Sequence, residues 1–562
     1  MSTTYTIKEQ LEGFPLFQMI IIGTLRLSEP IAFTSMFPYI YFMIRSFGIA
    51  KNEADTSRYS GYLASSFAFS QFISTVQWAK LSNKYGRKTI LLLGCLGTAL
   101  SMLVFGFSSN FYMAMFARSL MGLLNGNVSI IRTTVGEIAH EKRHQALAFS
   151  NLTLLWSLGR CVGGWLGGFL TDTDKLNLST HAGANDESGK RSGATPNTPF
   201  FDKHPFAFSN IIVACILSCF ITIGFLFLEE THEDYKDKRD IGLEIGDVIR
   251  KRLGFQVPDR PWKTQRYTND FEQAEHLIED DETTENVELQ QFSYDEEGNK
   301  KEHIHEDFNM KKENSEESTT STDSTTSSSA SSTNESLHDT FSNLPTQVVH
   351  IISNDFMIKF SNIIYAEFFP VFLAKVVMPD DLKFPFRIRG GFGWNSDAIG
   401  WLLSFTGLLG VFVVSFLFPV ITRFFPPRIA YRIGLICYPF IYVSIPLYIF
   451  TIPKYNSSIP PIVSKVLLYF TACLTSFSSS LTASQGIILI HRASPKRQRA
   501  LINSYNMSIA ALSRCAGPIL WGWIIAHFEI MGYEGFSWWL LGIFSLAAFF
   551  YSFKLTGEEY EE

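Results

Sequence analysis

Long apolar runs separated by short polar stretches dominate the pattern of the chain. A bilayer core about 30 Å thick needs roughly 20 apolar residues of helix, and twelve runs of the chain meet this need. They form a group of six, a long polar interruption and a second group of six. The runs lie near residues 15–45, 58–79, 89–108, 111–132, 145–170, 206–228, 350–377, 397–420, 429–450, 462–490, 499–526 and 533–555. The pattern predicts an all-α membrane protein with twelve transmembrane helices.

Positive charge is concentrated in four of the loops between these runs. Basic loops follow the second, fourth, eighth and tenth runs, at 80–88, 142–143, 423–432 and 492–499. Short loops rich in Lys and Arg remain in the cytosol during membrane insertion. We therefore expect cytosolic N- and C-termini, with the long polar interruption in the cytosol as well.

The polar interruption differs in composition from the rest of the chain. From Glu229 to Thr340 there are 30 Asp and Glu against 13 Lys and Arg, a charge of −17, whereas the remainder carries +11. This segment lacks the apolar residues that a folded core needs. We expect a six-helix half at 1–228, a disordered acidic and Ser-rich cytosolic linker at 229–349, and a second six-helix half at 350–562. Within the linker, 241–252 is expected to form a short amphipathic helix on the membrane surface.

Cysteines and glycosylation sequons add two smaller expectations. All seven cysteines fall in apolar runs without the spacing of metal ligands, which predicts free thiols and no metal site. Asn177 and Asn456 begin Asn-x-Ser sequons in loops on the side opposite to the basic loops. They are therefore candidates for N-glycosylation.

An internal repeat relates the two groups of six runs. At a constant offset of 354, residues 143–168 align with 497–522, and ten of the 26 positions are identical. A weaker match aligns the segment that begins at Gly61 with the one that begins at Gly400. The fifth run thus corresponds to the eleventh, and the second to the eighth. Two related halves in the same orientation are typical of major facilitator transporters, whose halves are related by an axis along the membrane normal.

The loop after the second run carries a recognisable motif. The segment at 78–88 reads WAKLSNKYGRK and resembles the major facilitator loop signature Gly-x-x-x-Asp-x-x-Gly-Arg-Lys. Gly86, Arg87 and Lys88 match, whereas Ala79 replaces the first Gly and Asn83 replaces the Asp. The resemblance implies that this loop clamps neighbouring helix ends in one conformation. Asn83 retains hydrogen bonding but not the charge.

Two further motifs lie inside the runs. Arg118, followed by glycines at four-residue spacing, resembles the fourth-helix motif that proton-driven family members use in coupling, although it could also be a structural Arg paired with a carbonyl or carboxylate. The fifth run resembles the glycine motif of family antiporters, with Gly164 at the position of its Pro, and the eleventh run has a complementary remnant. Small residues at such spacing allow close helix packing. The motif residues are Gly159, Gly163, Gly164, Gly168, Gly517 and Pro518.

Four charged residues at membrane depth are candidates for substrate or proton binding, because such groups are costly in lipid. Glu29 precedes a Pro and is either a proton carrier or the partner of Arg26, one turn earlier. Glu367 is a second candidate carrier. Arg160 and Arg514, which the repeat makes equivalent, either bind an anionic substrate or hold the two halves together.

The chain as a whole resembles the zinc-induced facilitator-like branch of the major facilitator superfamily, particularly its fungal, vacuolar members. The resemblance rests on RLSEPIAF in the first run, HQALAFS at the start of the fifth, the repeat and the long polar middle. It implies a major facilitator fold and secondary active transport of a small solute by alternating access, with proton-coupled antiport as the favoured mechanism. The alternative is a membrane receptor or sensor of the same fold that has lost transport.

Further expectations concern chemistry, partners and location. The polar residues within the runs are scattered singly, so no catalytic cluster is recognisable and we do not expect an enzyme. We expect no cofactor apart from coupled protons, a small-molecule substrate, a lipid bilayer as surroundings and no nucleic-acid partner. We also expect a multi-pass protein that functions as a monomer, in the vacuole or another internal membrane rather than the plasma membrane.

Overall fold

The computed structural model describes residues 13–139, 142–171, 200–201, 204–258, 260, 262, 345–495 and 499–555. Within these ranges nearly all regular structure is helical, and isolated bridges occur only in the loops around 377–390 and 533. The helices before the undescribed stretch are α2 (Leu16–Thr34), α3 (Ile40–Ser46), α4 (Glu53–Tyr85), α5 (Arg87–Gly106), α6 (Phe111–Leu123), α7 (Asn127–Ile138), α8 (Lys142–Phe169), α11 (Ala207–Phe227) and α12 (Ile241–Arg252).

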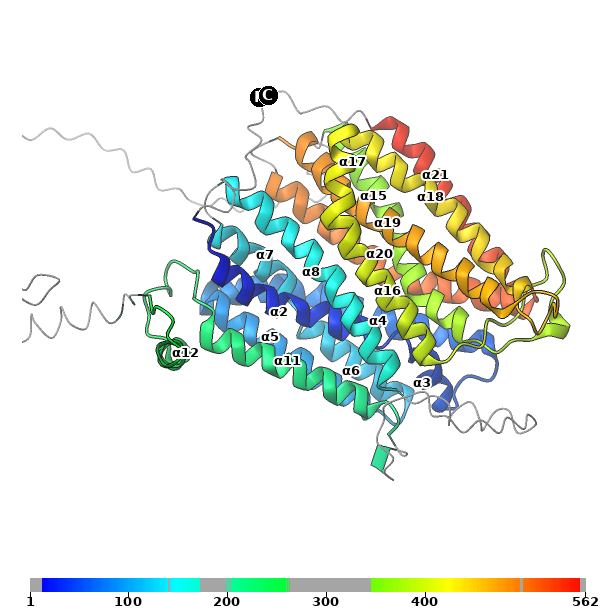
Figure 1. The fold of residues 1–562 in the computed structure, drawn as a ribbon, viewed down its shortest axis with the longest axis horizontal. Helices are drawn as coiled ribbons and strands as arrows, with labels where there is room; N and C mark the ends of the chain where they lie inside the picture. Colours follow the sequence, from blue (N-terminus) through cyan, green and yellow to red (C-terminus); the bar gives the residue numbers. More distant parts are fainter. Residues whose placement is uncertain are drawn as a thin grey trace, which may run out of the picture. The chain divides into compact units, whose positions relative to one another are not determined.

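The second half of the chain repeats this arrangement (Figure 1). Its helices are α15 (Thr346–Ala374), α16 (Ser396–Phe412), α17 (Phe418–Phe424), α18 (Pro427–Leu447), α19 (Pro461–Ala493), α20 (Arg499–Ile530) and α21 (Gly535–Tyr551). A π-helical turn at Val413–Leu417 joins α16 to α17. Each of the twelve predicted apolar runs coincides with one helix or with two consecutive helices.

In the part of the chain that the structure describes, nine helical segments are long and apolar enough to cross a membrane. The runs predicted at 58–79, 111–132 and 145–170 are helical but fall outside this set. The first of them, α4, contains many Ser residues and other polar side chains, so it is less apolar than its neighbours. The second is interrupted between α6 and α7. The all-helical membrane fold is confirmed, whereas the count of twelve spans stays a prediction.

Two helix pairs join the halves most extensively, α4 with α20 and α8 with α16. Figure 1 shows α8 and α16 side by side where cyan meets yellow. A Cβ atom at Gly61 of α4 would lie 2.3 Å from the carbonyl oxygen of Pro518, and one at Gly400 of α16 would lie 2.8 Å from that of Gly164. Gly164 and Pro518 are equivalent in the sequence repeat. The two junctions are therefore built by equivalent residues, as a repeat of two halves requires.

The buried apolar residues are divided unevenly between the two ends of the helices. We call the end with the 85–87, 424–427 and 493–499 connections the basic end, and the end with the 46–53, 374–396 and 530–535 connections the opposite end. One cluster contains residues of both halves, and its N-terminal members, such as Met36 to Ile44, lie toward the opposite end. Near the basic end, the N-terminal half has a separate cluster around Leu25 and Trp78.

Candidate functional site

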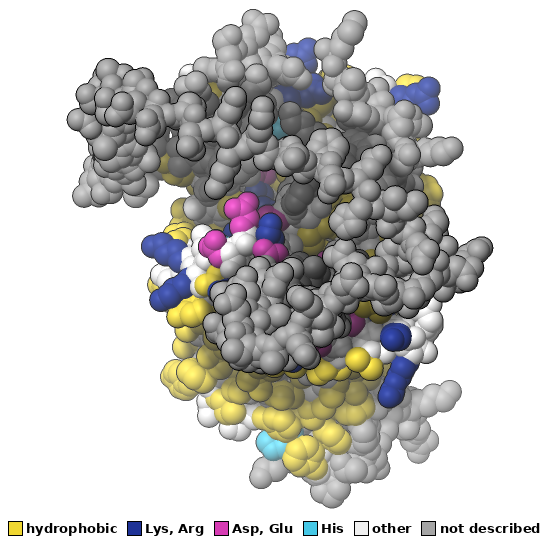
Figure 2. All heavy atoms as spheres, turned by 90° about the vertical axis from the view of Figure 1, so that its left-hand side faces the viewer, with side chains coloured by type: hydrophobic (Ala, Val, Ile, Leu, Met, Phe, Trp, Pro, Cys, Tyr) yellow, Lys and Arg dark blue, Asp and Glu magenta, His cyan; other side chains and the backbone are white. Residues whose placement is uncertain are grey.

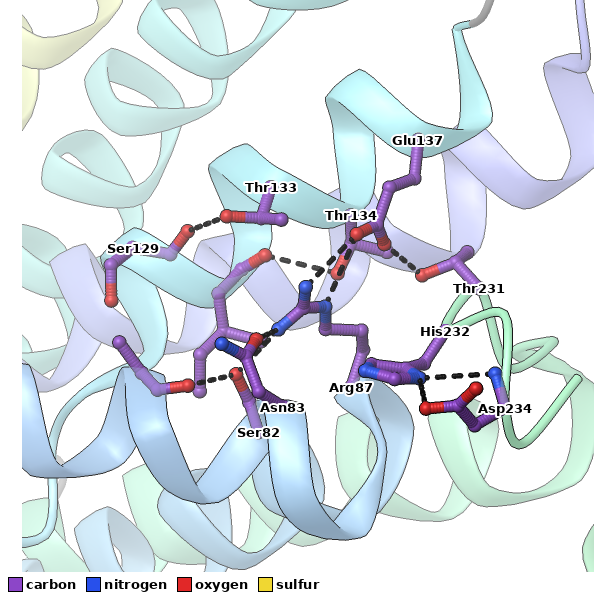
Figure 3. Close-up of polar contacts among 12 residues, drawn as sticks. Ser82, Asn83, Arg87, Ser129, Thr133, Thr134, Glu137, Thr231, His232 and Asp234 are labelled. Atoms are coloured by element: carbon purple, nitrogen blue, oxygen red, sulfur yellow. Dashed lines mark hydrogen bonds and ion pairs between the residues drawn. The ribbon is translucent and has the colours of Figure 1, made fainter. Parts of the chain in front are cut away.

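Arg87 is the centre of a polar network at the basic end (Figure 3). Its Nε and NH2 atoms donate to Oε1 of Glu137 in α7 at 3.2 and 3.1 Å, and its NH1 atom donates to Oγ of Ser82 at 2.9 Å. NH1 also donates to Oδ1 of Asn83. On the other side of Glu137, Thr231 donates to Oε2 at 2.5 Å. The network fastens the ends of α4, α5 and α7 to the chain that follows α11.

Glu230 holds the first turn of α5. Its two carboxylate oxygens accept the backbone N–H groups of Arg87 at 2.8 Å and Lys88 at 3.1 Å. These groups have no partner inside the helix, and a carboxylate at a helix N-terminus also interacts favourably with the helix dipole. Gly86 precedes the helix with φ +95°, and a Cβ there would lie 2.4 Å from Oε2 of Glu230. Gly86 is therefore required both by its backbone conformation and by the position of Glu230.

The third matched residue of the loop motif connects to α12, which has the bounds of the predicted amphipathic helix. Lys88 donates through Nζ to Oδ2 of Asp240 at 2.7 Å, and Oδ1 of Asp240 caps α12 by accepting from Leu243 N at 3.1 Å. α12 packs against the end of α11 at Gly242 and Gly246. On the face drawn in Figure 2, acidic and basic side chains lie beside one another next to a broad hydrophobic area.

These contacts join the N-terminal half to the first part of the predicted linker, since Glu230, Thr231 and Asp240 follow residue 228. None of them reaches the C-terminal half. The Asp of the loop signature would stand where Asn83 now accepts a single bond from Arg87. Sequence reasoning did not identify Glu137, Glu230 or Asp240, the acidic partners of the motif. Their positions depend on how α7 and the chain after α11 return to the loop.

Arg118 and Glu367 are buried charges that approach each other from different halves. Arg118 lies in α6 and Glu367 in α15, and each is 1% exposed. Arg118 contacts the rings of Phe67 at 4.8 Å and Phe33 at 5.7 Å, and NH1 lies 3.4 Å from the Met121 sulfur. Its Nε and NH2 atoms and Oε2 of Glu367 have no hydrogen-bond partner. The two charges interact at longer range without an ion pair between them in the described structure.

Glu29 has the predicted partner Arg26 and two further arginines near it. It forms an ion pair with Arg26 in the same helix, and Arg26 lies over the ring of Trp156 at 5.2 Å. Arg132 of α7 and Arg514 of α20 interact electrostatically with the same carboxylate. Glu29 therefore lies among three arginines. Whether it carries protons stays a prediction.

Arg160 extends from α8 toward the C-terminal half. It interacts electrostatically with the hydroxyl groups of Tyr365 in α15 and Tyr438 in α18. Within the described residues, Arg160 makes no hydrogen bond or ion pair, although its side chain is half-buried. Tyr438 stacks on Tyr442 at 5.9 Å, and Asn362 donates to its hydroxyl at 3.0 Å. The guanidinium of Arg160 is therefore unpaired, and its polar neighbours are the hydroxyl groups of two tyrosines.

The glycines of the fifth run pack on two different helices. Toward α2, a Cβ at Gly159 would lie 2.4 Å from Pro30 Cγ, and one at Gly163 would lie 2.3 Å from Thr34 Oγ1. Toward α16, Gly164 and Gly168 approach Leu403 and Gly400, and in α20 Gly517 approaches Ile363 of α15. Small residues on both faces let α8 fit between the helices of two halves.

Two further groups of residues are an ion pair in α15 and the glycosylation sequons. Asp355 and Lys359 of α15 form an ion pair with each other. Asn456 is exposed in the 451–460 loop at the opposite end, and Asn177 lies outside the described residues. Among the residues that the structure describes, no group of three His, Cys, Asp or Glu side chains could hold a metal ion.

Comparisons with known proteins cover most of the chain. A family model described as the Major Facilitator Superfamily matches residues 27–243 and 356–562. The major facilitator superfamily multidrug transporter mfsB of Aspergillus fumigatus is 28% identical over 561 residues, which cover 98% of this chain and 85% of that protein. Protein ZINC INDUCED FACILITATOR 1 of Arabidopsis thaliana is 35% identical over 164 residues, 29% of this chain and 34% of its own.

A solved structure supports the fold. The crystal structure of a bacterial homologue of the human lysosomal transporter Spinster, in an inward-facing and occupied conformation, matches with a TM-score of 0.57. The match covers 97% of each chain at 11% sequence identity. At this level of identity the likeness concerns the fold alone.

Proposed function

Because the chain belongs to the major facilitator superfamily, we propose that it exchanges an organic anion for protons by alternating access between its two halves. The superfamily consists of transporters rather than enzymes, so the chain is a multi-pass membrane transporter of small molecules. The anion, the coupled proton and the exchange mode belong to the proposal. The observation that carries it is the unpaired Arg160 between the halves.

The substrate site that we propose is centred on Arg160. A guanidinium at membrane depth is costly unless a partner satisfies it, and its neighbours Tyr365 and Tyr438 provide hydroxyl groups and rings rather than a carboxylate. An aromatic anion would supply the missing charge to Arg160 and a ring to the tyrosines. Arg514, its repeat equivalent, has Glu29 nearby, so it is less available to a substrate.

For the proton we propose Glu367, with Arg118 as the charge that responds to it. A buried carboxylate oxygen without a hydrogen-bond partner is costly when ionised, and Oε2 of Glu367 is such an atom. Arg118, on the other half, also has unsatisfied donors. Ionised Glu367 attracts Arg118 and protonated Glu367 does not. Proton transfer would thereby change the attraction between the halves and bias the conformational equilibrium.

The distribution of apolar core supports an inward-facing state. The two halves share buried residues mainly toward the opposite end, while the N-terminal half has its own cluster near the basic end. If the basic end faces the cytosol, as its charges predict, access would be from the cytosol. We also propose twelve membrane spans. Nine are the long apolar segments of the described residues, and the other three are α4, α6 together with α7, and α8.

The branch and the compartment are further parts of the proposal. The match to a zinc-induced facilitator covers less than a third of the chain, and it supports the zinc-induced facilitator-like branch. That the chain is of the fungal type, in the vacuole or another internal membrane, is proposed from the sequence resemblance alone. We propose a monomer in which each half contributes to one central site. Asn456, exposed at the opposite end, is proposed as a glycosylation site.

The test is uptake of labelled naphthalenesulfonate, a permanently charged aromatic anion, into proteoliposomes with an imposed pH gradient. We expect uptake against the direction of proton flow, and its loss when a protonophore collapses the gradient. An aromatic ammonium ion of the same size serves as the matched substrate control. Uptake that ignores the gradient would contradict proton coupling, and binding without any flux would favour the sensor alternative.

A further inference from the structure

Three charged side chains meet at the opposite end of the C-terminal half. Lys375 directly follows α15, Glu529 lies in the last turn of α20, and Glu534 directly precedes α21. Nζ of Lys375 donates to Oε2 of Glu529 at 2.6 Å and to Oε1 of Glu534 at 2.7 Å. No side chain of the three is more than 3% exposed. The proposed substrate and proton residues are not among them.

The charges of this cluster do not balance. One ammonium group faces two carboxyl groups, so the fully ionised cluster would bury a net negative charge. A buried charge without compensation is strongly unfavourable. The remaining oxygens, Oε1 of Glu529 and Oε2 of Glu534, are buried without a hydrogen-bond partner. One added proton would neutralise the cluster.

The surroundings increase the imbalance on one side. Glu53, at the start of α4 in the other half, disfavours the ionised form of both carboxyl groups. Arg389 of the 375–395 loop has the opposite effect on Glu529, because its positive charge stabilises the carboxylate. Glu53 already has partners of its own, Arg45 at 3.3 Å and the hydroxyl of Tyr41 at 2.7 Å.

Burial and neighbouring charges shift the pKa values of Glu534 and Lys375. Burial, and next the charge of Glu529, raise the pKa of Glu534 well above its ordinary value, which Lys375 opposes only in part. Burial by itself lowers the pKa of Lys375, but the two carboxylates outweigh this effect and raise the pKa overall. Lys375 therefore keeps its charge, and the carboxyl pair takes up the proton.

We infer that Lys375, Glu529 and Glu534 form a proton-binding site that holds one proton while the helix ends around it are packed together. In this structure α15 packs against α3, and α20 against α4 of the other half. Separation of these ends would admit water, and water removes the cost of ionising both carboxyl groups. Acidic pH on this side therefore favours the packed conformation.

The test is the melting temperature of the purified full-length protein as a function of pH. A carboxyl whose pKa is raised by folding stabilises the folded state at low pH, and the contribution is lost as pH rises toward the raised value. We expect the wild type to lose melting temperature from about pH 4.5, the ordinary pKa of Glu, up to about pH 8, the raised pKa of Glu534. Glu534→Gln leaves one carboxylate for one ammonium and should flatten this dependence. Asp380→Asn, at an exposed carboxyl of the 375–395 loop, should retain the wild-type dependence.

Two further variants protect the test against a folding failure. Glu529→Gln should flatten the dependence as Glu534→Gln does, because either change balances the charges. Lys375→Met leaves two buried carboxyls without a cation, and it should melt earlier at high pH and recover in acid. The inference is overturned if both Gln variants keep the wild-type pH dependence. This result would leave the proposed transport function untouched, since that function rests on other residues.

Discussion

The basic end of the N-terminal half and the region between the halves both contain buried or half-buried arginines, but these arginines differ in their hydrogen-bond partners. Arg87 at the basic end has three side-chain acceptors, in Ser82, Asn83 and Glu137. Between the halves, Arg118 has donors without partners, and Arg160 makes no hydrogen bond among the described residues. A satisfied charge holds a structure in place, whereas an unsatisfied one is available to a ligand or a proton.

The largest effect is expected at Arg160. Arg160→Met should reduce uptake of naphthalenesulfonate about tenfold to a hundredfold, because it removes the charge-assisted bonds to the anion. Arg160→Lys retains the charge but not the planar guanidinium, so its uptake should lie between that of the wild type and that of Arg160→Met. Proteoliposome uptake measures the effect, with Arg387→Met, at the half-exposed Arg387 of the 375–395 loop, as the control. Equal uptake by wild type and Arg160→Met would place the substrate elsewhere.

The next effect concerns the two candidate proton carriers. Glu367→Gln keeps the side-chain size but cannot ionise, so uptake should no longer respond to an imposed pH gradient. Exchange of labelled for unlabelled anion, which needs no net proton movement, should persist. Glu29→Gln should retain the response at a lower rate, because Glu29 mainly balances the arginines around it. If Glu29→Gln lost the response to the pH gradient and Glu367→Gln retained it, Glu29 would be the proton carrier.

A smaller effect, on stability instead of transport, is expected at the basic end. Arg87→Met removes the bonds to Ser82, Asn83 and Glu137 and should destabilise the protein by about 1–3 kcal/mol. Thermal melting of the purified protein measures this change. A matched Lys84→Met exchange, at an exposed position in the last turn of α4, should leave the melting temperature nearly unchanged. If both variants melted alike, the Arg87 network would have no structural role.

The smallest effect is expected at Asn83, where the chain departs from the family motif. Asn83→Asp restores the carboxylate beside Arg87, and an exposed ion pair of this kind contributes about 0.2–1 kcal/mol. The melting temperature should rise slightly in low salt, and the gain should shrink in high salt. A gain that is independent of salt would mean that the charge is not the cause.

Much of the fold could be predicted from the sequence. Apolar runs of membrane length marked the positions of the long helices, and the offset-354 repeat indicated two related halves. The repeat also made Gly164 and Pro518 equivalent, and the structure shows equivalent contacts for them. Even α12 was predictable from its amphipathic pattern. These features depend on local periodicity and on internal similarity, which the sequence states directly.

The partners of the charged residues were much harder to predict. Arg26 and Glu29 are one turn apart, so their pairing was recognised as an alternative. Glu137 and Glu230 meet Arg87 only after several helices have been arranged. The same is true of Lys375 and its two carboxyls, which come from loops and helix ends that carry no motif. Contacts of this kind depend on packing between distant segments, and a single sequence does not specify them.

The central claim is that Arg160 binds the anion rather than holding the halves together, and equilibrium binding tests it most directly. The dissociation constant of naphthalenesulfonate should be compared between detergent-purified wild type and Arg160→Met, with the melting temperature of both measured alongside. The account predicts about tenfold weaker binding or more, at an unchanged melting temperature. Unchanged affinity with a lowered melting temperature would contradict it and would make Arg160 a structural residue of the junction.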